Sequence, residues 1–264
     1  MHTFQIDGVT FDAVATSRLP SAPDHFSVRK PPWMIERYRE LDEEFHDGNL
    51  VELGIDQGAS TAMLALLFRP RRMLALDIAP GPIEALAELV DRRQLTDRVG
   101  LHWGVDQSDT TSVQALVDRA FGDAALDLVV DDASHQLAPT SASFDLLFPR
   151  LRPGGLFVIE DWSHDHQRER RYEEAIEEGG ERGRRLSERI ADSLADGDAA
   201  PPPTLSRLVL QLVIAAAHAP EIVADLRICA GWCEVRRGTA QLAAPFHVAD
   251  HLGAIGRSLV TDTS

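Results

Sequence analysis

The stretch VELGIDQGAS, residues 51–60, decides the fold of this chain. An apolar run leads into a turn that contains Gly54 and Gly58, and Ser60 follows as a residue that can begin a helix. A strand, a glycine-rich turn and a helix in this order are typical of the first unit of a parallel α/β sheet. The glycine spacing is E-x-G-x-x-x-G, without the third glycine of the dinucleotide motif, which disfavours a nicotinamide cofactor.

Further apolar runs alternate with helical patterns along the next hundred residues. The apolar runs are residues 50–54, 73–78, 99–105, 126–132 and 156–161, and the helical patterns are residues 59–68, 82–93, 111–121 and 138–150. Continuous apolar runs separated by helices predict an α/β fold with a doubly wound, mostly parallel, Rossmann-like sheet covered on both faces. Glycines or acids stand at the ends of these runs, as is typical where a ligand binds at the carboxyl edge of such a sheet.

The rest of the chain is interpreted as additions to this sheet. Residues 1–47 are predicted to form an N-terminal arm with an Asp-Gly hairpin and a helix, and residues 48–264 the main domain. Residues 162–203 are highly charged, and they are interpreted either as solvated helices or as a lid-like insertion over the ligand site. An apolar helix at 204–217 and two strands that meet at Gly231 complete the predicted order.

Composition excludes several classes of protein. The net charge of −16 disfavours binding to nucleic acid or to anionic membranes. No apolar run reaches the ~18 residues of a membrane span, and the first ten residues lack the pattern of a secretory signal, so a soluble, cytoplasmic protein is expected. The two cysteines, Cys229 and Cys233, lack the spacing of a structural zinc site. Lysine occurs once, at Lys30, among 26 basic residues.

Polar residues at the strand ends are suited to a nucleoside cofactor. Asp77 ends the second run, and an acid at this place can accept hydrogen bonds from both ribose hydroxyls. Residues 104–109, after the third run, offer polar groups for an adenine. The candidate cofactor-binding residues are Glu52, Gly54, Gln57, Gly58, Ser60, Asp77, Asp106, Gln107 and Asp131.

A second group of acids is predicted to bind a metal. Asp132 follows the fourth run, while Glu160 and Asp161 end the fifth, and neighbouring strands lie ~5 Å apart. Converging carboxylates repel one another unless a cation or proton intervenes, and their oxygens suit Mg²⁺. His135, three residues after Asp132, can serve as a general base. The alternative is that Asp131 and Asp132 only cap a helix.

The stretches VELGIDQGAS, LALDIAP and RPGGLFVIED resemble successive motifs of class I S-adenosylmethionine-dependent methyltransferases, over about residues 48–162 and the terminal hairpin. The resemblance implies a seven-stranded sheet whose last strand is antiparallel. It also implies that the glycine-rich turn passes the methionine part of the cofactor and that Asp77 holds the ribose.

The D-D-x-S-H stretch and the later E-D pair resemble a narrower family. These are the metal-dependent macrolide sugar O-methyltransferases and the cephalosporin-biosynthesis methyltransferase-like proteins. This resemblance implies Asp132, Glu160 and Asp161 as metal ligands and His135 as the base. The chain departs from the family in having Ala133 where glycine is usual and in lacking the long N-terminal domain of the larger macrolide enzymes.

These patterns predict methyl transfer from S-adenosylmethionine to a sugar hydroxyl of an oligo- or polysaccharide or a glycosylated metabolite, with Mg²⁺ or a similar cation such as Mn²⁺ or Co²⁺. Abundant arginine fits an actinobacterial source and an enzyme of methylated-polysaccharide synthesis. The alternatives are a catechol or phenol O-methyltransferase and a non-catalytic S-adenosylmethionine-binding module. A homodimer through the arm is a further hypothesis, and Tyr38 and the arm around His25 and Lys30 are candidates for closing over the site.

Overall fold

The computed structural model describes residues 2–13, 21–181, 183–185, 188 and 204–260. Seven of its strands form one sheet in the order β6-β5-β4-β7-β8-β10-β9. They are β4 (Asn49–Leu53), β5 (Arg72–Asp77), β6 (Val99–Trp103), β7 (Leu126–Asp131), β8 (Leu151–Glu160), β9 (Val223–Cys229) and β10 (Trp232–Arg237). Strands β4 to β8 pair in parallel, and β10 is antiparallel to both of its neighbours. The predicted doubly wound sheet is therefore confirmed, including its antiparallel last strand.

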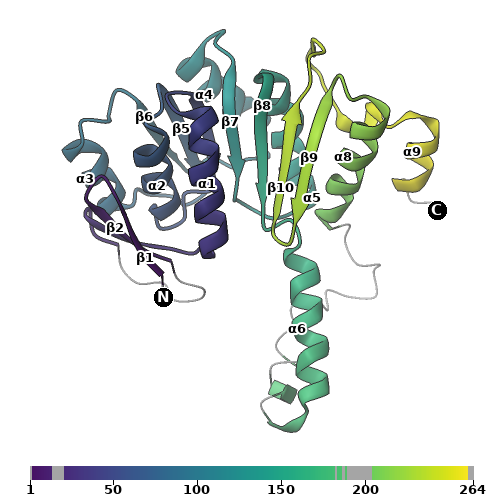
Figure 1. Cartoon of the computed structure of the whole chain (residues 1–264), viewed down its shortest axis with the longest axis horizontal. Coiled ribbons are helices and arrows are strands. Elements are labelled where there is room, and N and C mark those ends of the chain that lie inside the picture. The colour runs from purple at the N-terminus through teal and green to yellow at the C-terminus, as the bar shows by residue number, and fades with distance from the viewer. Residues whose placement is uncertain (1, 14–20, 182, 186–187, 189–203, 261–264) are drawn as a thin grey trace.

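Helices cover both faces of the sheet (Figure 1). One hydrophobic cluster contains α1 (Pro32–Phe45), α2 (Ala59–Phe68) and α3 (Glu84–Arg92), and the other contains α4 (Thr110–Phe121), α5 (Leu137–Leu147) and α8 (Ser206–His218). The strands serve both clusters because successive side chains point to opposite faces. In β7, Val130 belongs to the first cluster and Val129 to the second. This explains why the central strands are continuous apolar runs.

The N-terminal segment packs into the first of these clusters. Its strands β1 (His2–Ile6) and β2 (Val9–Ala13) form the predicted hairpin, with positive φ at both Asp7 and Gly8. A third strand, β3 (His25–Val28), pairs in parallel with β2 and was not predicted. Phe11 and Phe26 are fully buried with the residues of α1 and α2. The division into domains at residue 47 stays a prediction, although the two parts share this core.

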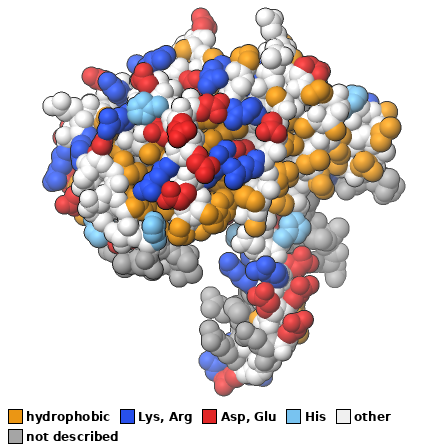
Figure 2. Space-filling model, in the orientation of Figure 1, with side chains coloured by type: hydrophobic (Ala, Val, Ile, Leu, Met, Phe, Trp, Pro, Cys, Tyr) orange, Lys and Arg blue, Asp and Glu red, His pale blue; other side chains and the backbone are white. Residues whose placement is uncertain are grey.

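The charged segment after β8 begins as a helix that projects from the body. Helix α6 (His164–Glu178) extends away from the sheet in Figure 1, and its visible surface in Figure 2 is mostly charged. Residues 182, 186–187 and 189–203 of the predicted lid lie outside the described residues, so the lid stays a prediction. The described chain also contains the 3₁₀ turns Phe148–Arg150 and Val248–His251 and helix α9 (Gly253–Val260).

Two expectations from composition can be compared with these elements. Among the helices that the structure describes, none has the length and apolar character of a membrane-spanning segment. Cys229 and Cys233 lie on the β9–β10 hairpin as free thiols, the first exposed and the second buried.

Candidate active site

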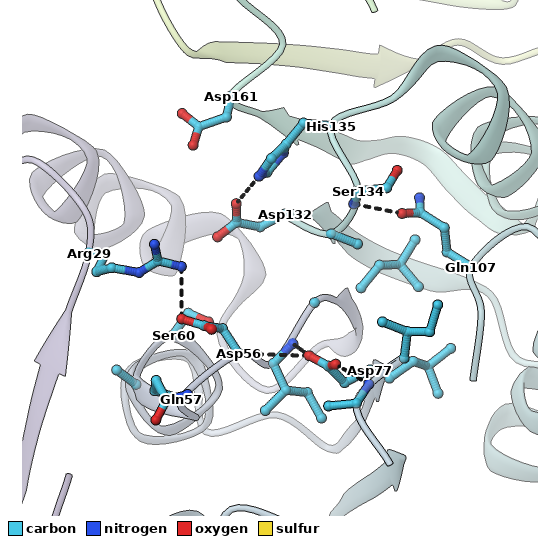
Figure 3. A pocket seen from close by; sticks show the side chains of 18 of the residues that line it. Arg29, Asp56, Gln57, Ser60, Asp77, Gln107, Asp132, Ser134, His135 and Asp161 are labelled. Atoms are coloured by element: carbon cyan, nitrogen blue, oxygen red, sulfur yellow. Dashed lines mark hydrogen bonds and ion pairs between the residues drawn. The ribbon is translucent and has the colours of Figure 1, made fainter. Parts of the chain in front are cut away.

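A cavity of about 810 Å³ opens at the carboxyl ends of the parallel strands (Figure 3). The loops after β4, β5, β6, β7 and β8 line it, together with residues 27–30 of the N-terminal segment and the first turns of α6. Its volume lies within the ~300–1,000 Å³ of typical small-molecule sites. The cavity therefore lies at the carboxyl edge of the sheet, where the strand-end residues predict a ligand site.

The loop after β4 needs glycine at both predicted positions. Gly54 has φ +95° and Gly58 has φ +81°, values that residues with a side chain rarely adopt. A Cβ on Gly54 would lie 2.2 Å from the carbonyl oxygen of Asp132, and a Cβ on Gly58 would lie 2.9 Å from the Cβ of Leu86. These glycines let the turn pass close to its neighbours before α2 begins.

The carboxylate of Asp77 holds the same turn from the next strand (Figure 3). Its Oδ2 accepts hydrogen bonds from the backbone N–H groups of Ile55 at 2.7 Å and Asp56 at 2.8 Å, and its Oδ1 accepts one from Ala79 at 2.7 Å. A carboxylate offers about four lone-pair sites, so Asp77 keeps capacity for a ligand hydroxyl. Asp77 lines the cavity and also fixes the shape of the turn.

Glu52 lies beneath the turn. The hydroxyl of Ser60 donates to Glu52 Oε1 at 2.6 Å, while Oε2 has no hydrogen-bond partner in the described part of the chain. Burial raises the pKa of Glu52 to about 7. Glu52 is therefore placed to support the start of α2, and Ser60 is the member of this pair that lines the cavity.

Asp131 anchors the loop that follows β7. Its Oδ2 accepts hydrogen bonds from Gln107 Nε2 at 2.9 Å and from the Ser143 hydroxyl at 2.9 Å. Gln107 Oε1 in turn accepts a hydrogen bond from the backbone N–H of Ser134 at 3.0 Å. Burial raises the pKa of Asp131 to about 6. This buried network fixes the residues that lead to His135.

The predicted cofactor residues thus fall into two groups. Gly54, Gln57, Ser60, Asp77, Asp106 and Gln107 line the cavity, whereas Glu52, Gly58 and Asp131 are buried behind its wall. The second group supports residues that face the cavity. Direct contact of any of them with a cofactor stays a prediction.

Three potential metal ligands meet at the cavity wall. One ligand atom each of Asp132, His135 and Asp161 lies within 4.8 Å of the others, and His135 Nε2 is 3.9 Å from Asp132 Oδ1 (Figure 3). His135 and Asp161 have φ values of 55° and 51°, which are strained for residues with a side chain. The backbone N–H of Asp161 donates to the carbonyl of Gly231 at 2.8 Å and so holds this conformation.

Glu160, the third predicted ligand, is placed outside that group. Its Oε2 accepts a hydrogen bond from Lys30 Nζ at 2.5 Å and its Oε1 accepts one from the Tyr38 hydroxyl. Lys30 Nζ also donates to Asp132 Oδ2 at 2.8 Å, so Lys30 joins the two acids. Strand β8 ends at Glu160, and the positive φ of Asp161 turns the chain away from the strand, so the two adjacent carboxylates separate. The ligand role of Glu160 that the resemblance implies stays a prediction.

The charges of this buried group depend on one another. Burial raises the pKa of Glu160 above its usual value. Burial alone would lower the pKa of Lys30, but the Asp132 and Glu160 carboxylates outweigh it and raise that pKa. Lys30 is therefore a permanent cation at the site.

The N-terminal segment and α6 also contribute residues to the cavity wall. Arg29 donates to Asp56 at 2.8 Å over the glycine turn, and the ring centroid of His164 is 5.9 Å from that of His135. His25, a candidate for closing over the site, instead contacts Asp12 at 2.7 Å. The sequence indicates Lys30 only as part of an arm that could close over the site, and no local pattern predicts its ion pairs with Asp132 and Glu160.

Comparison with known proteins identifies the part of the chain that carries this site. Residues 51–162 match a family model described as a methyltransferase domain. These residues form a methyltransferase domain. It contains the glycine turn, Asp77, Asp132, His135 and the E-D pair. The residues predicted to bind the cofactor and those predicted to bind the metal therefore both lie within this domain.

Relatives of the methyltransferase domain match over short segments. A 56-residue segment, 21% of this chain, is 52% identical to 8-demethyl-8-alpha-L-rhamnosyl tetracenomycin-C 2'-O-methyltransferase from Streptomyces olivaceus. A 59-residue segment, 22% of this chain, is 46% identical to mycinamicin VI 2''-O-methyltransferase from Micromonospora griseorubida. Each match spans 14% of the relative.

A solved structure shares the fold. MycE methyltransferase from the mycinamycin biosynthetic pathway, in complex with Mg, SAH and mycinamycin VI, superposes with a TM-score of 0.51 at 24% sequence identity. The match covers 78% of this chain and 49% of the other. The chain thus spans about half the length of this neighbour, and the likeness establishes the Rossmann-like fold.

Proposed function

We propose that this chain is an S-adenosylmethionine-dependent O-methyltransferase that uses a divalent cation and acts on a sugar hydroxyl. The observation that carries the proposal is that the Asp132–His135–Asp161 group opens into the same cavity as the glycine turn and Asp77. The relatives support it, because two are named for O-methylation of a rhamnosyl tetracenomycin and of L-olivosyl-oleandolide. The Mg and SAH of the MycE complex agree with the proposed cofactors.

The cavity wall fits S-adenosylmethionine. The turn at Gly54 brings main chain to the cavity without side chains, and Asp77 offers carboxylate oxygens to ribose hydroxyls. Asp77 and Asp106 make this part of the wall acidic, whereas the charge of Asp56 is compensated by Arg29. Because the sulfonium of S-adenosylmethionine is positively charged, an acidic wall favours its binding.

The acid group fits a divalent cation such as Mg²⁺. Ligand atoms of one octahedral Mg²⁺ lie at most about 4.2 Å apart. The donor atoms of Asp132, His135 and Asp161 lie within 4.8 Å of one another, so small side-chain shifts would bring them to one ion. Carboxylate oxygens are hard ligands of the kind that Mg²⁺ prefers. We assign Asp132 and Asp161 to the cation, and His135, at the edge of the group, to proton transfer.

The chain's own residues would align and deprotonate the acceptor. When bound, S-adenosylmethionine supplies the methyl group and the divalent cation supplies positive charge that acidifies the hydroxyl. His135 accepts the hydroxyl proton at its ring nitrogen. Asp132 Oδ1, 3.9 Å from His135 Nε2, stabilises the charge that the imidazole gains. The Gln107–Ser134 hydrogen bond holds the loop on which His135 lies.

A panel of acceptors tests the substrate class. Labelled S-adenosylmethionine is incubated with the chain, Mg²⁺ and, in parallel, methyl mannoside, methyl rhamnoside, a rhamnosylated polyketide, a mannose oligosaccharide or catechol. Label in one or more sugars, and not in catechol, is the expected result. Label in catechol alone would replace the sugar assignment by a phenol. S-adenosylhomocysteine binding without transfer to any acceptor would favour the non-catalytic module.

A further inference from the structure

The ammonium of Lys30 occupies a buried position between Asp132, which we assign to the cation, and Glu160, whose carboxylate lies outside the Asp132–His135–Asp161 group. Lys30 Nζ lies 2.8 Å from Asp132 Oδ2 and 2.5 Å from Glu160 Oε2, and its side chain is 3% exposed. We infer that Lys30 is the resident counter-ion of Asp132 and Glu160 and competes with the divalent cation for the Asp132 carboxylate. This inference rests on the proposed function, because it concerns the same metal site.

Lys30 is held in place from several sides. It lies between the end of β3 at Val28 and the start of α1 at Pro32, so both neighbouring elements restrict its main chain. The Tyr38 ring centroid is 5.9 Å from Nζ, and the Tyr38 hydroxyl occupies the second oxygen of Glu160. A buried ammonium needs charged partners, and the described structure provides them only through these acids.

The charges around Lys30 suit one divalent cation. When all three are ionised, Asp132, Glu160 and Asp161 carry three negative charges, and Lys30 compensates one of them. One divalent cation neutralises the two that remain. Lys30 therefore keeps the acids ordered before the cation arrives, and it weakens the binding of the cation because the two positive charges share the Asp132 carboxylate.

Competition and simple scaffolding predict opposite effects when the lysine charge is removed. If Lys30 only oriented Asp132, its loss would loosen that carboxylate and weaken cation binding. If Lys30 competes, its loss removes a repelling charge and frees an oxygen of Asp132 and of Glu160. Coulomb repulsion at this range makes the second effect about tenfold or more in affinity.

The test is the binding of Mn²⁺ to the full chain, measured by electron paramagnetic resonance without added cofactor. Lys30→Met keeps the length of the side chain and removes its charge, and it is expected to bind Mn²⁺ about tenfold more tightly than the wild type. The matched control is Arg39→Met, since Arg39 pairs with Glu36 on the surface of α1, and its affinity is expected to stay within about twofold of the wild type.

A second pair of variants covers the case in which Lys30→Met does not fold without metal. Glu160→Gln and Lys30→Met/Glu160→Gln differ only in the lysine, and neither leaves Glu160 charged and unpaired. The double variant is expected to bind Mn²⁺ more tightly than Glu160→Gln. Binding that is equal or weaker without Lys30 in both backgrounds would overturn the competition. If no variant binds Mn²⁺ at all, the metal site of the proposed function fails together with it.

Discussion

Gly54 lies directly against the main chain of Asp132, so that a Cβ at position 54 would stand 2.2 Å from the Asp132 carbonyl oxygen. The backbone N–H of Asp132 also donates to the carbonyl of Leu53 at 2.9 Å. The turn assigned to the cofactor and the loop assigned to the metal are therefore one continuous wall. A change in one of them is expected to move the other.

Gly54→Ala tests this contact. The methyl group cannot fit without moving the Asp132 loop, and φ +95° is strained for alanine, so we expect a loss of about 3 kcal/mol in the free energy of unfolding. S-adenosylhomocysteine and Mn²⁺ should both bind more weakly, as measured by calorimetry. The control is Gly122→Ala, at φ +57° and ψ −128° with open space around its Cβ, which should lose about 1–3 kcal/mol through backbone strain alone and keep both affinities. Unchanged Mn²⁺ affinity in Gly54→Ala would refute the coupling.

His135→Ala tests the proton acceptor. We expect kcat to fall by about 10²–10⁴, while the affinity for S-adenosylhomocysteine stays near that of the wild type, because the imidazole acts on the acceptor proton. His164→Ala is the matched control, since its ring centroid lies 5.9 Å from that of His135 on another element. Its kcat should fall far less. An equal decrease of kcat in the two variants would contradict the assignment of His135 as the proton acceptor.

Asp77→Ala tests the acid that holds the glycine turn. Three backbone N–H groups, of Ile55, Asp56 and Ala79, lose their acceptor, and a bound ribose would lose its carboxylate. We expect S-adenosylhomocysteine to bind at least about tenfold more weakly in calorimetry. Asp109→Ala removes a carboxylate that caps α4 through Ser112, so it should lower stability by about 1 kcal/mol without changing this affinity. Equal affinities of the two variants would count against Asp77.

The buried carboxyl of Glu52 predicts a pH dependence of stability. Burial raises the pKa of Glu52 from its usual value of about 4.5 to about 7 in the fold, so between these pH values the folded chain binds a proton that the unfolded chain releases. The free energy of unfolding should therefore decrease as the pH rises from about 4.5 to 7, with Glu52 contributing up to about 3 kcal/mol. Urea denaturation of the wild type and Glu52→Gln across this range measures the contribution. Parallel curves for the two proteins would contradict the prediction.

Much of the fold follows from local sequence pattern. The buried strands β4, β5 and β7 are continuous apolar runs, and their observed ends lie within a residue of the predicted ones. The start of β8 was placed five residues too late, because the polar stretch at 152–155 hides the extension back to Leu151. Strand β3 was missed because it has four residues and pairs with a strand more than ten residues away.

The site was predictable in its residue types but only partly in its geometry. The acids at the ends of β7 and β8 could be placed near one another because parallel strands end at one edge. Glu160 and Asp161 are adjacent in sequence, and the pattern does not tell which of them faces the cavity. The ion pair of Glu160 with Lys30 spans 130 positions and depends on how the N-terminal segment packs.

Metal removal tests the central claim, divalent-dependent methyl transfer, most directly. Transfer of label from S-adenosylmethionine to a sugar acceptor is measured with Mg²⁺, with excess EDTA, and after Mg²⁺ is restored, using the wild type and Asp161→Asn. We predict that EDTA abolishes transfer by the wild type, that Mg²⁺ restores it, and that Asp161→Asn is poorly active throughout because it lacks one charged ligand. Transfer that continues undiminished in EDTA would contradict the assignment of Asp132 and Asp161 to a divalent cation.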